Sequence, residues 1–302
     1  MSDVLYQRIT REHDNRKYKR KPAKGNLIIK LENMINKSCY KVVEFDGYII
    51  PIDGSKVTLL LYCREYNRDL NSLKIEDLAN LLFDELKKEV EFALSEKLTN
   101  IFDCSLACVF SPYDYPRDEQ EAEEKDIIVF PYIEKKKILK KMNIKSFRNF
   151  LYDHKKRFTV KPLIFAPTKL EYYLSQLPYG QTKTIAFPGD ADGIFMDEHY
   201  NILAILEYKS DTYGKNINEE RQDKYKEDTT RFNVLDDLCK LLDVPLIIIF
   251  WSDTHTKSKI IVRNANNKKE ISFIIESENY SYLATEIFDT LNKLDDFVEK
   301  IK

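Results

Sequence analysis

The residues best suited to chemistry are carboxylates at the outer ends of two apolar segments. The segment 193–196 is short and apolar, residues 197–201 are polar and turn-like, and the segment 202–206 is an unbroken apolar run. Two such runs around a polar tip predict an antiparallel hairpin, and the unbroken run is typical of a strand buried on both faces. If the turn is centred between His199 and Tyr200, Asp192 lies opposite Glu207, with Cα atoms ~4.5–5.5 Å apart.

The second strand would end on Glu207-Tyr208-Lys209. Residues two apart share a strand face, so Glu207 and Lys209 lie together and Tyr208 points the other way. Two facing carboxylates repel, and burying them without a counter-ion is costly. Mg²⁺ would relieve this repulsion, because it binds one or two carboxylates together with waters and phosphate oxygens. A lysine beside a bound water could orient that water or take its proton. The pattern therefore favours a metal-dependent nuclease.

This arrangement resembles the PD-(D/E)xK nuclease superfamily over the segment 165–255. The family pattern is an acidic residue at the start of one strand and an acid-x-Lys tripeptide at the end of the next. Asp192 matches the first acid, Glu207 the second and Lys209 the lysine. The resemblance implies an α/β fold in which a restriction-endonuclease-like mixed sheet is flanked by helices.

The resemblance also implies a ligand set for Mg²⁺ or Mn²⁺. Asp192, Glu207 and the main-chain carbonyl of Tyr208 would bind the metal, and Lys209 would be the catalytic lysine. Asp190 stays open as an alternative first ligand, because Pro188-Gly189-Asp190 partly matches the literal motif. The hairpin register favours Asp192.

Flanking segments fit the same expectation. A helix is predicted over 168–174, and its Glu171 matches the glutamate that many family members carry on a helix before the first strand; Glu171 also reads as a helix-capping residue. Residues 218–242 read as a long helix and residues 244–251 as a buried strand. The expected core order is strand, strand, helix, strand.

Two other functions compete for these residues. Asp190-Ala191-Asp192-Gly193 resembles the Asp-x-Asp-Gly motif of haloacid-dehalogenase-like phosphatases, whose nucleophilic aspartate directly follows a hydrophobic strand. Here Pro188-Gly189 intervenes. The second alternative is a non-cleaving nucleic-acid-binding module on a nuclease-like fold. The paired carboxylates and the lysine argue against it, because a site that no longer cleaves has no reason to keep them.

Two basic stretches could bind a phosphate backbone. The first is an N-terminal block, and the second lies within the segment 135–161, which interleaves lysines with aromatic residues. Both stretches are equally well explained as solvent-exposed surface with no binding role. Their candidate binding residues are Arg16, Lys17, Lys19, Arg20, Lys135, Lys136, Lys140 and Lys141.

Size and composition set the remaining limits. The chain has 302 residues, a net charge of −2 and 43% hydrophobic residues, which suffices for real cores. No apolar run reaches the ~18 residues of a membrane span, and the N-terminus lacks the apolar region of a secretory signal. We therefore expect a cytoplasmic protein with no membrane partner. Five irregularly spaced cysteines argue against a disulfide framework.

The expected organisation is an N-terminal arm over 1–25, an α+β domain of unknown role over 26–158 and the nuclease-like domain over 159–302. The middle domain could bind a partner protein or a second copy of the chain. Within it we expect one helix over 75–99, a turn at Asp46-Gly47, and no internal repeat. The function that follows is a Mg²⁺-dependent endonuclease in restriction, defence or repair. Family frequency alone favours DNA over RNA as the substrate.

Overall fold

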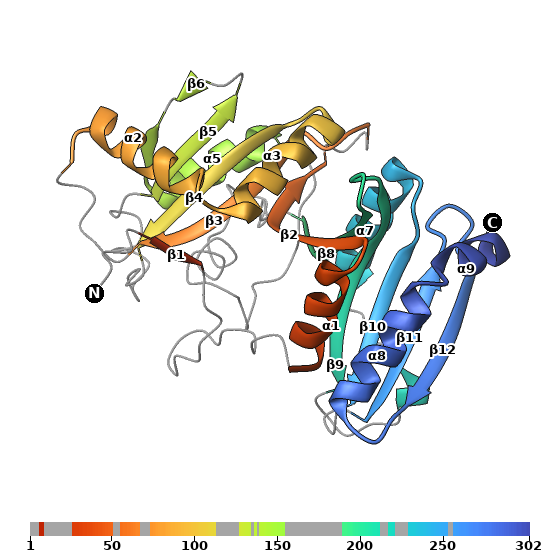
Figure 1. Ribbon diagram of the computed structural model, residues 1–302. Helices are drawn as coiled ribbons and strands as arrows, with labels where there is room; N and C mark the ends of the chain where they lie inside the picture. The colour runs from red at the N-terminus through yellow and green to blue at the C-terminus, as the bar shows by residue number, and fades with distance from the viewer. Residues whose placement is uncertain are drawn as a thin grey trace. The chain divides into compact units, whose positions relative to one another are not determined.

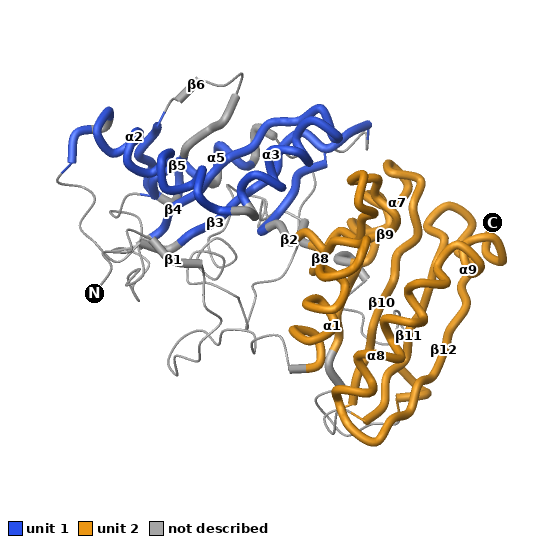
Figure 2. The backbone as a smooth tube through the Cα atoms, viewed as in Figure 1, with its two compact units in different colours: residues 1–23, 45–189 blue, residues 24–44, 190–302 orange. Residues whose placement is uncertain are grey.

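The computed structural model describes residues 6–8, 26–50, 55–66, 73–112, 127–133, 136–137, 139–154, 189–211, 217–220, 229–252 and 256–302. They form α-helices and mixed β-sheets (Figure 1). The chain divides into unit 1, residues 1–23 and 45–189, and unit 2, residues 24–44 and 190–302 (Figure 2). This division differs from the expected contiguous domains over 26–158 and 159–302, because residues 24–44 belong with the C-terminal part of the chain.

Unit 2 holds the candidate site and is built from a mixed sheet covered by helices. Its first strand, β2 (Tyr40–Ile49), begins in unit 2 and ends in unit 1, because the division between the units falls after residue 44. In chain order the elements are α1 (Asn26–Lys37), β2 (Tyr40–Ile49), β8 (Gly189–Asp197), β9 (Ile202–Asp211), η3 (Ile217–Glu219), α7 (Thr229–Leu242), β10 (Leu246–Ser252), β11 (Lys257–Arg263), β12 (Glu270–Glu276), α8 (Tyr280–Leu291) and α9 (Leu294–Ile301).

The strand order in unit 2 is β12-β11-β10-β9-β8, with β2 next to β8. β8 and β9 form an antiparallel hairpin, β10 lies parallel to β9, and β11 and β12 continue antiparallel. α7 makes the crossover between the parallel strands β9 and β10, as parallel pairing requires. The order β8, β9, α7, β10 is the strand, strand, helix, strand order expected from the sequence.

The hairpin tip fixes the β8–β9 register. The Asp197 carboxylate accepts hydrogen bonds from the main-chain N–H groups of His199 and Asn201, both at 2.8 Å. These bonds mimic a backbone turn and favour a tight reversal. Tyr200 adopts a left-handed conformation, with φ 66°. The paired strands then place Gly193 opposite Leu206.

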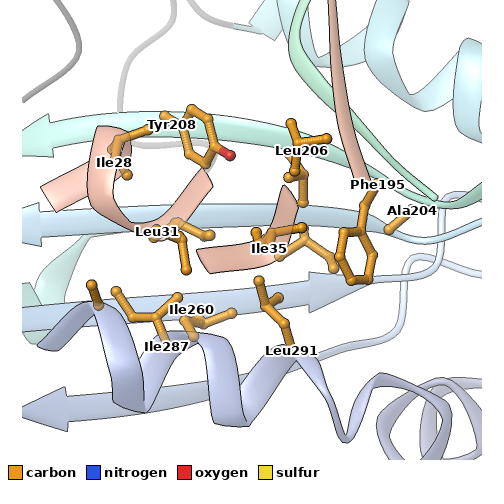
Figure 3. Close-up of a cluster of buried hydrophobic side chains, with 14 of the residues drawn as sticks. Ile28, Leu31, Ile35, Phe195, Ala204, Leu206, Tyr208, Ile260, Ile287 and Leu291 are labelled. Carbon is orange, nitrogen blue, oxygen red and sulfur yellow. The ribbon is translucent and has the colours of Figure 1, made fainter. Parts of the chain in front are cut away.

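One face of the unit 2 sheet is covered by α1, α8 and α9. The buried face of α1 carries Leu27, Ile28, Leu31 and Ile35, at the spacing of one helix stripe. Figure 3 shows this stripe packed on strand residues that include Leu206 and Tyr208, with α8 beside it. The α8 helix begins at its cap Asn279, whose side chain accepts hydrogen bonds from two main-chain N–H groups.

The opposite face of the sheet carries α7. Asp236 of α7 is buried and forms ion pairs with Arg263 of β11, at 3.3 Å, and with Lys268 of the following turn. A buried carboxylate needs such counter-charges. These pairs attach α7 to the sheet.

Unit 1 is a second mixed sheet with its own helices. Its strand order is β2-β3-β4-β5-β6, with β7 beside β5 and β1 beside β3. Helix α5 packs on one face over Ile49, Leu61 and Val109, and α3 packs on β3 and β4. The elements are β1 (Tyr6–Arg8), the end of β2, β3 (Leu59–Tyr66), α2 (Ile75–Leu86), α3 (Val90–Phe102), β4 (Ser105–Pro112), β5 (Ile127–Ile133), β6 (Lys136–Lys137), β7 (Lys140–Met142) and α5 (Ile144–His154).

Several expected elements differ from the structure. Asp46-Gly47 is not a turn but part of β2, where Gly47 is buried and pairs with Leu61. The helix expected over 75–99 is two helices, α2 and α3. In the segment 218–242 only η3 and α7 are helical among the described residues. None of the described helices has the length and apolar character needed to cross a membrane.

Candidate metal centre

Asp192 lies where β8 begins to pair with β9. The pairing of β8 with β9 begins at Gly193 opposite Leu206, and continuing that register outward by one residue would place Asp192 opposite Glu207, the juxtaposition that the sequence predicts. The half-buried Asp192 carboxylate accepts a hydrogen bond from the main-chain N–H of Tyr208, with 2.6 Å between Oδ2 and N. Since a charged acceptor makes a short, strong hydrogen bond, this contact holds the first carboxylate beside the Glu-x-Lys strand.

Glu207 and Lys209 form the second part of the site. The Glu207 side chain is fully buried, while that of Lys209 is 22% exposed, and Nζ lies 3.5 Å from Oε1. The lysine supplies the positive charge that a buried carboxylate requires. The ring of Phe232 on α7 lies 5.5 Å from the same ammonium. Glu207 and Lys209 therefore lie on the face of the sheet that α7 covers.

The main-chain carbonyl of Tyr208 completes the expected donor set. The N–H and C=O of one strand residue point to the same side of the strand. Because the N–H of Tyr208 donates to Asp192 on β8, its carbonyl also points toward β8. The Tyr208 side chain lies on the opposite face, among the residues that pack against α1 (Figure 3). The backbone of Tyr208 thus faces β8 and Asp192, while its ring belongs to the hydrophobic core.

The three side chains Asp192, Glu207 and Lys209 carry a net charge of −1, and their oxygens are hard donors. Mg²⁺ and Mn²⁺ bind carboxylate and carbonyl oxygens and keep several waters. The residues present therefore fit a divalent cation. Among the described residues no cluster of three or more His, Cys, Asp or Glu side chains is arranged around a common point.

One lysine near the site was missed from the sequence. Lys259 of β11 is 8% exposed, and its ammonium donates to the carbonyls of Asn218, at 2.9 Å, and Glu220, at 2.7 Å. Lys209 and Lys259 both pair with Phe250, from opposite sides of β10. The sequence shows only an alternating strand with two lysines, which normally indicates a solvated face. Lys259 instead binds the segment that follows β9.

The remaining candidate residues are not brought to this centre by the described contacts. Glu171, Arg16, Lys17, Lys19, Arg20 and Lys135 lie outside the described residues. Lys136 is in β6 and Lys140 and Lys141 are in β7, all in unit 1.

The helix that precedes the first strand of unit 2 is α1. This helix carries a half-buried glutamate, Glu32, which the sequence pattern did not single out.

The phosphatase alternative does not match the position of the aspartates. A nucleophilic aspartate of that class directly follows a hydrophobic strand. Asp190 and Asp192 instead lie in the first half of β8, before its apolar residues. The Asp192 carboxylate is also held by the N–H of Tyr208.

Three of the described cysteines are not set up as nucleophiles. Burial raises the pKa of Cys104 to about 12, with Asp103 adding to the effect. Burial likewise raises the pKa of Cys108 and of Cys239 well above the usual range. The thiolate is the reactive form of cysteine, so these three thiols are held in the unreactive form.

Comparison with models of known protein families, with characterised proteins and with solved structures gives no significant match to this chain.

Proposed function

We propose that unit 2 is a metal-dependent nuclease of the PD-(D/E)xK type, which hydrolyses phosphodiester bonds. The observation that carries this proposal is the hydrogen bond from the Tyr208 N–H to Asp192. It holds Asp192 against the strand that presents Glu207 and Lys209, whose side chains form an ion pair on the face that α7 covers.

The arrangement of elements supports the same proposal. The hairpin β8–β9 is followed by α7 and by β10, which lies parallel to β9. Helix α1 and the start of β2 precede this hairpin in unit 2. This order agrees with a restriction-endonuclease-like core, in which the acid-x-Lys tripeptide lies on an inner strand of the sheet. The tripeptide Glu207-Tyr208-Lys209 occupies that place on β9.

The chemistry follows from the charges of the site. A divalent cation held by Asp192, Glu207 and the Tyr208 carbonyl would polarise a phosphate and lower the pKa of a bound water. The ammonium of Lys209, which is partly exposed beside Glu207, would orient the attacking water or stabilise negative charge developing on the phosphate. Glu207 holds the Lys209 ammonium in place through their ion pair. Such a preorganised charge is worth most in a site from which water is excluded.

We propose DNA as the substrate and restriction or another defence process as the setting. Family frequency favours DNA, and the basic stretches of the chain could bind its backbone. The test is incubation with supercoiled DNA, linear duplex, single-stranded DNA and RNA, each with Mg²⁺ or Mn²⁺. Cleavage of a DNA substrate that stops with a chelator supports the proposal. Binding without any cleavage under these conditions would establish a non-cleaving module instead.

A further inference from the structure

The two units repeat one order of elements. In unit 2, β8 and β9 are antiparallel, α7 crosses over to the parallel strand β10, and β11 returns antiparallel. In unit 1, β2 and β3 are antiparallel, α2 and α3 cross over to the parallel strand β4, and β5 returns antiparallel. No internal repeat is evident in the sequence, so the correspondence rests on individual residues of the two units.

The crossover helices correspond at their ends. α3 is followed by Asp103 with φ 48°, and α7 by Asp243 with φ 52°. In both units the next N–H bonds to the carbonyl five residues back, at 3.1 Å for Cys104 and 3.0 Å for Val244. Few residues other than glycine adopt this left-handed conformation. Aspartate is enriched in this conformation and many helices end in it, so the two aspartates agree with a correspondence for which the strand pairing gives the stronger evidence.

The strands after these helices keep the same spacing. Phe110 on β4 and Phe250 on β10 stand equally far beyond the two left-handed aspartates. Phe110 pairs with Arg64 of β3, and Phe250 pairs with Lys209 of β9. Arg64 in unit 1 therefore occupies the position of the candidate catalytic lysine in unit 2.

The aspartates of the two hairpins correspond as well. Asp46 and Asp192 are each followed by a buried glycine. The Asp46 Oδ2 accepts a hydrogen bond from the N–H of Cys63 at 2.6 Å, and the Asp192 Oδ2 accepts one from the N–H of Tyr208 at 2.6 Å. Asp46-Cys63 in unit 1 is thus the counterpart of Asp192-Tyr208 in unit 2.

The residues before these two N–H groups differ. Tyr62-Cys63-Arg64 stands in unit 1 where Glu207-Tyr208-Lys209 stands in unit 2. The second carboxylate of the unit 2 site is therefore replaced by the phenol of Tyr62. Tyr62 contacts Phe92 of α3, and Lys209 contacts Phe232 at the matching position of α7. The two sites therefore share the arrangement of their strands and helices but differ in their charged side chains.

The guanidinium of Arg64 lies between two carboxylates. Its Nη1 is 3.5 Å from Asp46, its Nη2 is 2.9 Å from Glu89, and it stacks 3.6 Å from the centre of the Tyr62 ring. The hydroxyl of Tyr62 donates to the same Glu89 oxygen. Although burial lowers the pKa of Arg64, Asp46, Tyr62 and Glu89 together raise it above its usual value. Arg64 is therefore a fixed positive charge in the core of unit 1.

We infer that unit 1 is a second copy of the unit 2 core, and that Arg64 supplies in it the positive charge that a divalent cation would supply in unit 2. The comparison with a cation rests on the proposed metal centre, whereas the duplication of the core does not. The chain then has one metal centre, in unit 2. In the corresponding place of unit 1 the guanidinium of Arg64 occupies the position between the carboxylates.

The first experiment removes the guanidinium. In an Asp192→Asn background, which disables the unit 2 site, Arg64→Ala leaves Asp46 and Glu89 facing each other. Mg²⁺ or Ca²⁺ should then raise the melting temperature by about 2–4 °C at tenfold excess over its Kd. The Asp192→Asn protein should not respond, and adding Asp46→Asn should abolish the response. Arg263→Ala is the matched control, because within the described part of the chain Arg263 pairs with one carboxylate, that of Asp236.

The second experiment rebuilds the unit 2 residues in unit 1. Tyr62→Glu with Arg64→Lys recreates the Glu-x-Lys pattern beside Asp46, and Mn²⁺ bound per chain, measured by electron paramagnetic resonance, should rise by one. This variant keeps a positive charge in the core and remains informative if Arg64→Ala does not fold. A cation response in either experiment supports the inference that Arg64 takes the place of a cation in unit 1, and no response in both overturns it. A wild-type chain that binds no Mn²⁺ would instead contradict the unit 2 proposal.

Discussion

At the scale of single residues, the central feature is a buried carboxylate with one lysine beside it. Glu207 is fully buried and its ion-pair partner Lys209 reaches the surface of the site. Burial of a charge costs several kcal/mol in real proteins unless partners compensate. A buried carboxylate kept beside a partly exposed ammonium is therefore expected to serve chemistry rather than stability, because apolar side chains would pack as well.

Asp192→Asn tests the metal at this scale. Mg²⁺ at tenfold excess over its Kd should stabilise the wild-type chain by about 1.4 kcal/mol, and the variant far less, because it lacks one ligand charge. Paired melting curves with and without Mg²⁺ measure the difference. Asp190→Asn is the matched control and should respond like wild type. Equal shifts in wild type and Asp192→Asn, with a lost shift in Asp190→Asn, would make Asp190 the ligand.

At the scale of elements, β8 is held between β2 and β9 with almost no spare room. A Cβ at Gly193 would lie 2.7 Å from Val42 of β2 and 3.8 Å from Leu206 of β9. Only glycine allows the two strands to approach this closely. The position of Asp192, one residue earlier, depends on that approach.

Gly193→Ala should therefore destabilise the protein by about 1–3 kcal/mol, the range for overpacking a core. Urea denaturation measures the cost. Val42→Ala removes the methyl that the new Cβ would meet, so the double variant should cost less than the two single variants together, with a coupling of roughly 0.5–3 kcal/mol. Additive costs would show that the β2–β8 contact does not limit this position.

The hairpin was predictable from the sequence because its signals are local. A polar tip between apolar runs predicts the reversal, and the register then places Asp192 opposite Glu207. The turn expected at Asp46-Gly47 was wrong because tertiary pairing overrode turn chemistry. Gly47 pairs with Leu61 inside a continuous strand. Lys259 was missed because its partners are main-chain carbonyls of η3 and Glu220, which no sequence pattern marks.

At the scale of the whole molecule, the chain consists of two units that are not contiguous in sequence. α1 and the start of β2 belong to unit 2 although the rest of unit 2 begins at Asp190. The stacked rings of Tyr40 and Phe195, whose centres are 5.0 Å apart, join these distant segments. Pairing over so long a separation leaves no local signal, which is why the contiguous division expected from the sequence differs from the units in the structure.

Neutralising the second basic stretch tests whether it contacts nucleic acid. Alanine substitutions should weaken binding and flatten the slope of log K against log salt by roughly 0.7–0.9 per lost phosphate contact. The substituted residues are Lys135, Lys136, Lys140 and Lys141. The control replaces four exposed lysines elsewhere in unit 1, so that the net charge is matched: Lys56, Lys87, Lys88 and Lys97. An unchanged slope in the first variant would show that this stretch does not touch the backbone.

The most direct test of the central claim is cleavage of supercoiled DNA by the wild-type chain and by Lys209→Ala, in Mg²⁺ and in chelator. Wild type should cut only with the metal, and Lys209→Ala should be slower by ~10²-fold or more, the range for one positioned catalytic group. Lys257→Ala, which removes an exposed lysine paired with Glu276, should retain wild-type activity. Circular dichroism should show that all three proteins are folded. A Lys209→Ala protein that cuts as fast as wild type would contradict the account.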